Sequence, residues 1–259
     1  MITAGIDVGL ENIKVVILQD GKIIGRGIGR TGGAGRASAI ESVMASALQE
    51  AKIEAGNVEK TIATGKGRYD AAIAGEQYTE LVTAARAARF LHPDADAVVD
   101  AGADETLIAS MEKDGRIRES TINQKCAAGI GTFLRNMADR LEMSLEELGA
   151  LPPADPAGIT VSDGCVVFGE MDALSCLNHG ASPKEVAEAV IESAAIRACS
   201  VIKEPTLPIG DKILLVGGLA KNAAFVAALE RQAGIRFIIP TDAEYAGALG
   251  AALTAIPLS

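Results

Sequence analysis

The pattern of apolar and polar positions predicts a similar series of strands twice along the chain. Residues 2–29 predict three strands, in which ITAGIDVG, IKVVILQ and KIIGRGIG are joined by short polar turns. Near residue 96 the order starts again with AVVDAG, TLIASM and RIRESTIN. Each half opens with a buried strand that carries an aspartate near its end and leads into a hairpin. The pattern predicts an internal duplication with two related α/β lobes, 1–95 and 96–259, and the C-terminal helix is a candidate to complete the first lobe.

Between and after these strands, apolar residues recur three and four positions apart, which is the helical period. The helices expected from this spacing cover residues 37–55, 80–90, 130–142, 144–149, 165–179, 183–201, 221–232 and 244–255. Three further strands are expected ahead of a glycine loop at 61–68, at 212–218 and at 236–240.

Two cysteines stand at the expected starts of helices. Cys126 comes just before a small-residue turn and an apolar helical run, and Cys165 follows Ser162-Asp163-Gly164 in the same way, 39 positions later. The unpaired N–H groups and positive dipole of a helix N-terminus lower the pKa of a thiol and favour the thiolate. Two thiolates are half of the four that a [4Fe–4S] cluster takes, so a two-fold axis between two chains would complete the set. The alternative interpretation is that both cysteines are buried thiols with a structural role only.

The other two cysteines, Cys176 and Cys199, lie inside helical patterns and are expected to be buried small hydrophobes. Four cysteines without a secretory leader indicate a reducing, cytoplasmic environment, in which thiols serve metals or redox chemistry.

Composition and charge exclude some classes of binding partner. The chain has 259 residues, of which 49% are hydrophobic, so it can bury a large core. Its formal net charge of −10 argues against nucleic acid and against an anionic membrane surface as partners. The longest apolar runs are broken by charged residues, and no membrane-spanning helix is expected.

Each half also carries an Asp-x-Gly turn at the end of its first strand, Asp7-Val8-Gly9 and Asp100-Ala101-Gly102. Such a turn lets backbone N–H groups approach a phosphate while the carboxylate holds Mg²⁺. A glycine pair, Gly217-Gly218, follows a later strand and would let an adenosine lie against the backbone. The alternative reading is that these glycines only serve tight turns. Lys14 could reach a phosphate, but the pattern favours a solvated strand residue.

The order of GIDVG, DAG and LVGGLAKN resembles the actin, Hsp70 and sugar-kinase superfold, in which two ribonuclease H-like lobes enclose a nucleotide cleft. NQKCAAGIGTFL and DGCVVFGE resemble one branch of it, the ATP-dependent activators of 2-hydroxyacyl-CoA dehydratases and the related ATPase subunits of benzoyl-CoA reductase. The likeness spans nearly the whole chain, and the cysteine motifs are its most specific part.

The resemblance implies a set of site residues. Asp7 would hold Mg²⁺ and Asp100 would position Mg²⁺ or the attacking water. The residues implied to bind nucleotide are Gly9, Leu10 and Glu11 in the first phosphate motif, Gly102 and Ala103 in the second, and Gly217, Gly218, Ala220 and Asn222 in the adenosine motif. Cys126 and Cys165 would ligate one [4Fe–4S] cluster per dimer.

Three motif positions differ from the common family pattern. Leu10 and Glu11 stand where a Ser or Thr is usual, Ala103-Asp104 replaces a Gly-Gln-Asp stretch, and Thr132 stands where the cysteine motif often has Arg. These substitutions resemble the D-type subunit of benzoyl-CoA reductase.

The implied function is electron transfer through the shared cluster, driven by ATP hydrolysis. The implied partners are a second copy or a paralogous ATPase subunit, the catalytic subunits of an acyl-CoA dehydratase or of benzoyl-CoA reductase, and a ferredoxin or flavodoxin donor. Two alternatives stay open on the same superfold: a small-molecule kinase, and a nucleotide-binding protein without turnover.

Overall fold

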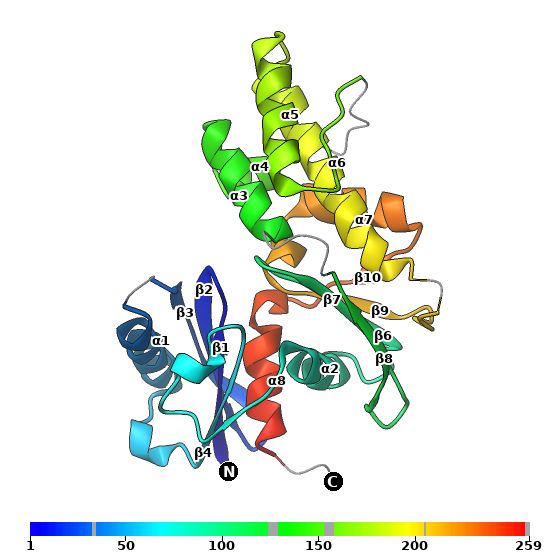
Figure 1. Ribbon diagram of the computed structural model, residues 1–259. Helices are drawn as coiled ribbons and strands as arrows, with labels where there is room; N and C mark the ends of the chain where they lie inside the picture. The colour runs from blue at the N-terminus through cyan, green and yellow to red at the C-terminus, as the bar shows by residue number, and fades with distance from the viewer. Residues whose placement is uncertain (33–34, 124–128, 153–157, 205, 257–259) are drawn as a thin grey trace. The chain divides into compact units, whose positions relative to one another are not determined.

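The computed structural model describes residues 1–32, 35–123, 129–152, 158–204 and 206–256 (Figure 1). The chain groups into two compact units. Unit 1 comprises Met1–Val98, Met111–Arg118 and Glu244–Ser259, and unit 2 comprises Val99–Ser110 and Glu119–Ala243. The lobe boundary near residue 95 stays a prediction.

Unit 1 is built on a mixed sheet with the strand order β3-β2-β1-β4-β5. β1 pairs antiparallel with β2 and parallel with β4. The strands are β1 (Ile2–Val8), β2 (Asn12–Gln19), β3 (Lys22–Arg30), β4 (Lys60–Thr64) and β5 (Glu76–Gln77). The three strands predicted within residues 2–29 are therefore confirmed, whereas β5 is too short to leave a periodic signal.

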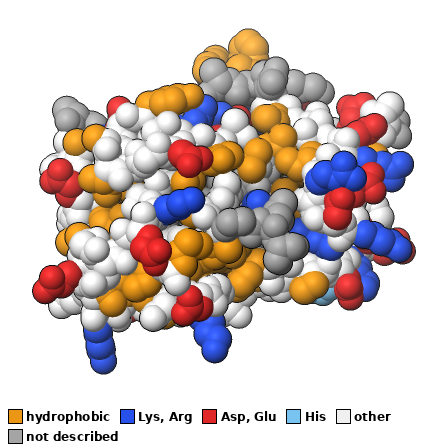
Figure 2. Space-filling view, turned by 90° about the horizontal axis from the view of Figure 1, so that it is seen from below, with side chains coloured by type: hydrophobic (Ala, Val, Ile, Leu, Met, Phe, Trp, Pro, Cys, Tyr) orange, Lys and Arg blue, Asp and Glu red, His pale blue; other side chains and the backbone are white. Residues whose placement is uncertain are grey.

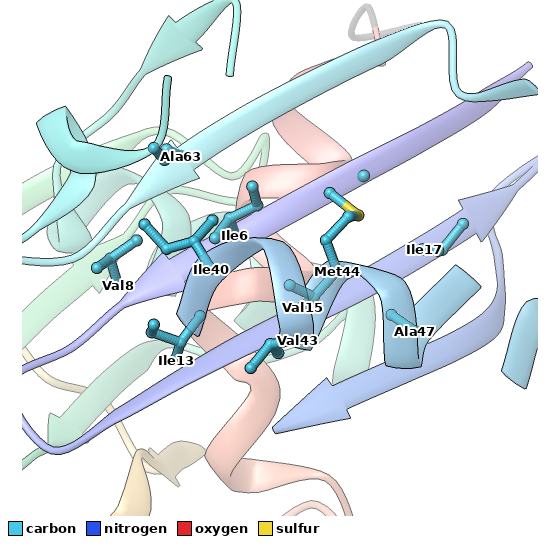
Figure 3. Close-up of a cluster of buried hydrophobic side chains, with 12 residues drawn as sticks. Ile6, Val8, Ile13, Val15, Ile17, Ile40, Val43, Met44, Ala47 and Ala63 are labelled. Atoms are coloured by element: carbon cyan, nitrogen blue, oxygen red, sulfur yellow. The ribbon is translucent and has the colours of Figure 1, made fainter. Parts of the chain in front are cut away.

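Helix α1 (Arg36–Ala51) covers one face of this sheet. Its apolar stripe meets the inward residues of β1 and β2 in one core, as Figure 3 shows for Ile6, Val8, Ile13, Val15, Ile17, Ile40, Val43, Met44 and Ala47. The helix was predicted to continue to residue 55 and ends earlier, because Lys52 adopts the left-handed conformation at φ 56°.

Helices α2 (Glu80–Leu91) and α8 (Ala246–Thr254) pack against each other, and α8 also packs on β1, β2 and β4. Glycines permit this close approach. A Cβ on Gly5 would lie 1.9 Å from the carbonyl oxygen of Ala248, and one on Gly250 would lie 1.8 Å from that of Thr83. The predicted C-terminal helix is confirmed, although its first turn, Ala243–Tyr245, is a 3₁₀ helix.

The second sheet has the order β10-β9-β6-β7-β8. Its strands are β6 (Ala97–Ala101), β7 (Thr106–Met111), β8 (Ile117–Ile122), β9 (Ile213–Val216) and β10 (Phe237–Ile238). The strand predicted over 236–240 is limited to two residues in β10, which pairs parallel with β9.

The described residues of unit 2 also form five α-helices: α3 (Ile130–Arg140), α4 (Leu145–Gly149), α5 (Val166–Asn178), α6 (Pro183–Ile202) and α7 (Ala223–Ala233). The long helix α6 packs against α3, α5 and α7 (Figure 1). Ser182 and Glu185 form a reciprocal capping box at its start, with Pro183 at the first helical position. All five helices were predicted from periodicity and are confirmed.

Positive and negative side chains occur next to one another on the face seen in Figure 2. None of the described helices combines the length and apolar character that a membrane span needs.

Of the two cysteines predicted to be buried, one is buried and one is not. Cys199 is buried, as expected, and burial raises the pKa of its thiol. Cys176 was expected to be buried as well and is only half-buried, since it lies in the last turn of α5, where the helix ends at Asn178.

Candidate functional site

The carboxylate of Asp7 lies near the end of β1 in unit 1. Lys14 stands opposite it in the antiparallel register with β2, and the Lys14 Nζ donates to Asp7 Oδ2 at 3.0 Å. Both side chains are only 15% exposed. The expectation that Lys14 is a solvated strand residue is therefore wrong, since the register brings its ammonium group onto the carboxylate.

Glycine backbones from two further segments of unit 1 approach the same carboxylate. A Cβ on Gly65, where φ is +89°, would lie 2.7 Å from Asp7 Oδ1, and a Cβ on Gly247 would lie 3.2 Å from Asp7 Cγ. The Gly67 amide donates to the Val8 carbonyl at 2.9 Å and holds the glycine loop against β1. The sequence showed this loop as a run of glycines, but only the tertiary fold brings it and Gly247 to Asp7.

The turn after Asp7 is fixed by its own backbone. The Gly9 amide donates to the Asn12 carbonyl at 3.1 Å, and the buried Thr31 hydroxyl donates to the Gly9 carbonyl at 2.8 Å. Leu10 at the tip is 48% exposed, and Glu11 forms an ion pair with Arg30 at 3.4 Å. At this turn the substituted motif presents an exposed apolar side chain in the position of the usual hydroxyl.

In unit 2 the Asp100 carboxylate lies against the backbone of Gly217. Gly217 has φ +90°, and a Cβ there would come within 2.3 Å of Asp100 Oδ1 and 2.5 Å of the Ala101 carbonyl oxygen. The Gly217 amide donates to the Ala243 carbonyl at 2.9 Å. Only glycine fits both the left-handed backbone and this packing. The fold thus joins the second Asp-x-Gly turn to the glycine pair.

Gly218 differs from its neighbour, because a Cβ added to it would meet no atom of the described residues within 4 Å. Further along the motif, Ala220 is buried, and Asn222 caps α7 by accepting a hydrogen bond from the Phe225 amide at 2.8 Å. The side chain of Asn222, which the resemblance implied to contact nucleotide, is thus engaged in the fold itself.

The turn after Asp100 is tied to the first turn of α3. The Gly102 amide donates to the Glu105 carbonyl at 3.1 Å, and this turn points the Ala103 carbonyl at Thr132. The Thr132 amide and hydroxyl both donate to that oxygen, at 3.0 and 3.1 Å. Thr132, noted in the sequence only as a departure from the family pattern, is therefore a link between the turn and the helix.

Glycines make this link tight. A Cβ on Gly129 would lie 2.1 Å from the carbonyl oxygens of both Ala103 and Asp104, and a Cβ on Gly131 would lie 2.8 Å from the Ala103 Cα. A movement of the Ala103 turn must therefore displace the start of α3, and the reverse also holds.

Cys165 is the N-cap residue of α5, as predicted, and its half-exposed side chain makes no capping hydrogen bond. Cys126 lies outside the described residues. Cys176 follows Cys165 by 11 residues on the same helix, about 16 Å along its axis, too far to share a cluster with it.

Within the described part of the chain, no group of three or more His, Cys, Asp or Glu side chains could hold a metal ion. Cys165 is one thiol at a helix start in this part, and the resemblance implies a second at Cys126. Two thiolates per chain fit a cluster shared between two chains and are too few for a complete site in one chain.

An apolar face lies directly after Cys165 on α5. Val167, Phe168 and Met171 are 63%, 61% and 59% exposed, and Leu174 continues the same side of the helix at 37%. The sequence placed Val167, Met171 and Leu174 on one face, and that face is exposed. Exposed apolar patches of this kind mark interaction surfaces.

Comparisons with known proteins agree with the arrangement. The model of the BadF/BadG/BcrA/BcrD ATPase family matches residues 4–255. The structure resembles that of the activator of the 2-hydroxyisocaproyl-CoA dehydratase from Clostridium difficile with bound ADPNP, at TM-score 0.89 and 30% identity, covering 98% of this chain and 94% of that one. The D-type subunit of benzoyl-CoA reductase from Thauera aromatica is 30% identical over 97% of this chain and 92% of its own length.

The activator of lactoyl-CoA dehydratase from Anaerotignum propionicum is 34% identical over 98% of this chain and 97% of its own length, so the comparisons do not favour the D-type branch over the activators. A ROK family glucokinase from Streptomyces griseus, at 14% identity and TM-score 0.61 over 97% of this chain and 98% of its own, shares the fold alone. The predicted fold class, an α/β protein of the actin, Hsp70 and sugar-kinase type, is confirmed.

Proposed function

Because the chain belongs to the BadF/BadG/BcrA/BcrD ATPase family, we propose that it hydrolyses ATP with Mg²⁺ and uses the energy to drive electron transfer through a [4Fe–4S] cluster shared between two subunits. The recipient would be an acyl-CoA dehydratase or benzoyl-CoA reductase, as the names of the relatives suggest. The electron donor would be a ferredoxin or a flavodoxin.

The two aspartates support the ATPase part. Asp7 and Asp100 each lie at the end of a strand, each with glycine backbones packed against its carboxylate. In the proposal Asp7 holds Mg²⁺, and the ammonium group of Lys14 compensates the negative charge of the Asp7 carboxylate. Asp100 orients the metal or the attacking water. Phosphoryl transfer needs mainly such positioning and charge compensation. The unfilled space over Gly218 suits a nucleotide that approaches the backbone.

The cysteines support the electron-transfer part. Cys126 and Cys165 would supply two thiolates from each chain, and the N-terminus of α5 adds positive potential that favours an electron-rich group. When bound, the cluster would take up one electron and release it to the partner. The apolar face of Val167, Phe168, Met171 and Leu174 lies beside Cys165, and we propose that a second copy or a paralogous subunit covers part of it.

The observation that carries the coupling is the link between Ala103 and α3. The Ala103 carbonyl sits in the second phosphate turn, and α3 begins just after the segment that contains Cys126. If ATP hydrolysis shifts this turn, the two hydrogen bonds from Thr132 and the close packing of Gly129 transmit the shift to the cysteine segment. Nucleotide state would thereby change the surroundings of the cluster.

Gly129→Ala tests the coupling. The new Cβ would overlap the Ala103 and Asp104 carbonyls at 2.1 Å, while φ −63° suits alanine, so the effect is steric and local. We expect ATP hydrolysis to persist while nucleotide no longer alters the electron paramagnetic resonance spectrum of the reduced cluster. Gly56→Ala, where the new Cβ would have no atom of the described chain within 4 Å, is the matched control. An unchanged nucleotide response in Gly129→Ala would contradict the coupling route.

Assays of ATP hydrolysis and of phosphate transfer on the purified protein distinguish the proposed function from its two alternatives. A protein that binds ATP without turnover would be a nucleotide-binding component, and phosphorylation of an added metabolite would indicate a kinase. The glucokinase likeness extends only to the fold and does not favour that second outcome.

A further inference from the structure

Arg197 is the charged residue that the described part of the chain buries most completely. It lies in α6 and is 5% exposed, whereas the other buried polar residues of the described chain are threonines and serines. Removing a guanidinium from water costs several kcal/mol unless its surroundings compensate it. Its position therefore calls for a specific role.

The contacts of Arg197 lead to the segment before Cys165. Its Nη2 donates to the Ser162 carbonyl at 3.2 Å, and the Ser193 hydroxyl, also on α6, donates to the same oxygen at 3.0 Å. On the other side of this segment, the Ser162 amide donates to Asp172 Oδ2 in α5 at 3.0 Å. Both backbone polar groups of Ser162 are thus held by neighbouring helices.

Arg197 also reaches the helix that follows the other cysteine segment. Its guanidinium carbon lies 5.0 Å from the centroid of the Phe133 ring in α3. The same ring closes against α5, because a Cβ on Gly169 would lie 3.3 Å from Phe133 Cζ and 3.0 Å from the Ser162 carbonyl oxygen. One buried cation therefore contacts the approach to Cys165 and the first turns of α3.

We infer that Arg197 is a positioning residue for Cys165, and that its buried charge makes the cluster easier to reduce. The inference rests on the proposed cluster function. Ser162 precedes Cys165 by three residues, so fixing its carbonyl restricts where the sulfur can lie. Hydrogen bonds, net charge and solvent exposure around an iron–sulfur cluster set its reduction potential. A positive charge in a low-dielectric interior favours the state that carries one more electron.

Arg197→Met and Arg197→Lys separate position from charge in the reconstituted dimer. Met removes the donor and the charge, so we expect cluster loss to an iron chelator about tenfold faster than in the wild type, as is common for outer-shell partners. The midpoint potential, measured by dye-mediated spectroscopic titration, should fall. Lys keeps the charge but not the planar fork, so it should recover the potential while cluster loss stays fast.

Two further variants control the test. Arg140 joins α3 to Glu170 of α5 at 3.0 Å on a half-exposed surface, so Arg140→Met should leave both readouts unchanged. Ser193→Ala removes the other donor to the Ser162 carbonyl without changing charge, so it should speed cluster loss and keep the wild-type potential. A wild-type potential in Arg197→Met would overturn the electrostatic role, and wild-type cluster retention would overturn the positioning role.

Hydrogen exchange on the cluster-free chain tests the positioning role separately from the proposed function. The amides from Ser162 to Gly169 should exchange faster in Arg197→Met than in the wild type, while those of α7 stay unchanged. Equal exchange in the two proteins would overturn the positioning role. A wild-type protein that holds no cluster would instead refute the proposed function, and the exchange result would still stand for the loop.

Discussion

Alanine substitutions at Gly217 and Gly218 should separate folding from nucleotide binding. The two positions are adjacent, but their surroundings differ. At Gly217 the new methyl group would lie 2.3 Å from Asp100 Oδ1 on a backbone with φ +90°, whereas at Gly218 it would have no atom of the described part of the chain within 4 Å. The protein's own packing therefore requires glycine at the first position and tolerates a methyl group at the second.

The magnitudes follow from these contacts. For Gly217→Ala the positive-φ backbone at φ 90° and ψ 174° costs about 1–3 kcal/mol and the overlap about 1–3 kcal/mol, so the free energy of unfolding should fall by roughly 2–6 kcal/mol. For Gly218→Ala it should change by about 0.5 kcal/mol or less. If an adenosine lies against this backbone, the same methyl group should weaken ATP binding about tenfold, which corresponds to about 1.4 kcal/mol.

Urea unfolding without nucleotide and calorimetric titration with an ATP analogue measure the two effects separately. Gly218→Ala should unfold like the wild type and bind ATP more weakly. Wild-type affinity in Gly218→Ala would refute the placement of the nucleotide over this glycine. Wild-type stability in Gly217→Ala would refute the packing argument itself.

Further predictions concern catalysis, the ligands and the effect of acid. Asp100→Asn should retain ATP binding and lower the hydrolysis rate at least about tenfold, measured by phosphate release, and an unchanged rate would remove Asp100 from the mechanism. Cys165→Ala should abolish the brown chromophore of the anaerobically reconstituted protein and Cys176→Ala should not, and a chromophore that survives the first change would contradict the ligand assignment. Hydrogen bonds from Ser182 lower the pKa of Glu185. A lowered carboxyl pKa contributes stability above its unfolded value of 4.5, and this contribution is lost as the pH falls through the folded value. Ser182→Ala should therefore flatten the loss of stability below pH 4.5, and an unchanged acid transition would contradict the capping role.

Local signals predicted the elements well. Periodicity alone located the strands of the first hairpin, the helices of unit 2 and the start of α5 at Cys165. These features depend on residues close together in the chain, where apolar spacing and a Ser-Asp-Gly turn act directly on the backbone. The end of α1 was misplaced because the left-handed Lys52 carries no glycine signal.

The site was less predictable, because its contacts join distant segments. Gly247 reaches Asp7 only through the packing of α8 on β1, and Arg197 reaches Ser162 only through the packing of α6. Lys14 was assigned to solvent because a strand pattern does not show what stands opposite each residue. Thr132 illustrates the same limit, since its importance lies in a carbonyl 29 residues earlier in the chain.

The central claim is that two chains hold one [4Fe–4S] cluster and couple it to ATP. Native mass spectrometry of the protein purified anaerobically from its own host tests this claim most directly, since one spectrum gives both the chains present and their iron. The account predicts four irons and four sulfides per two chains, either two copies or one copy with a paralogous subunit. Four irons on a single chain, or a dimer without iron, would contradict it.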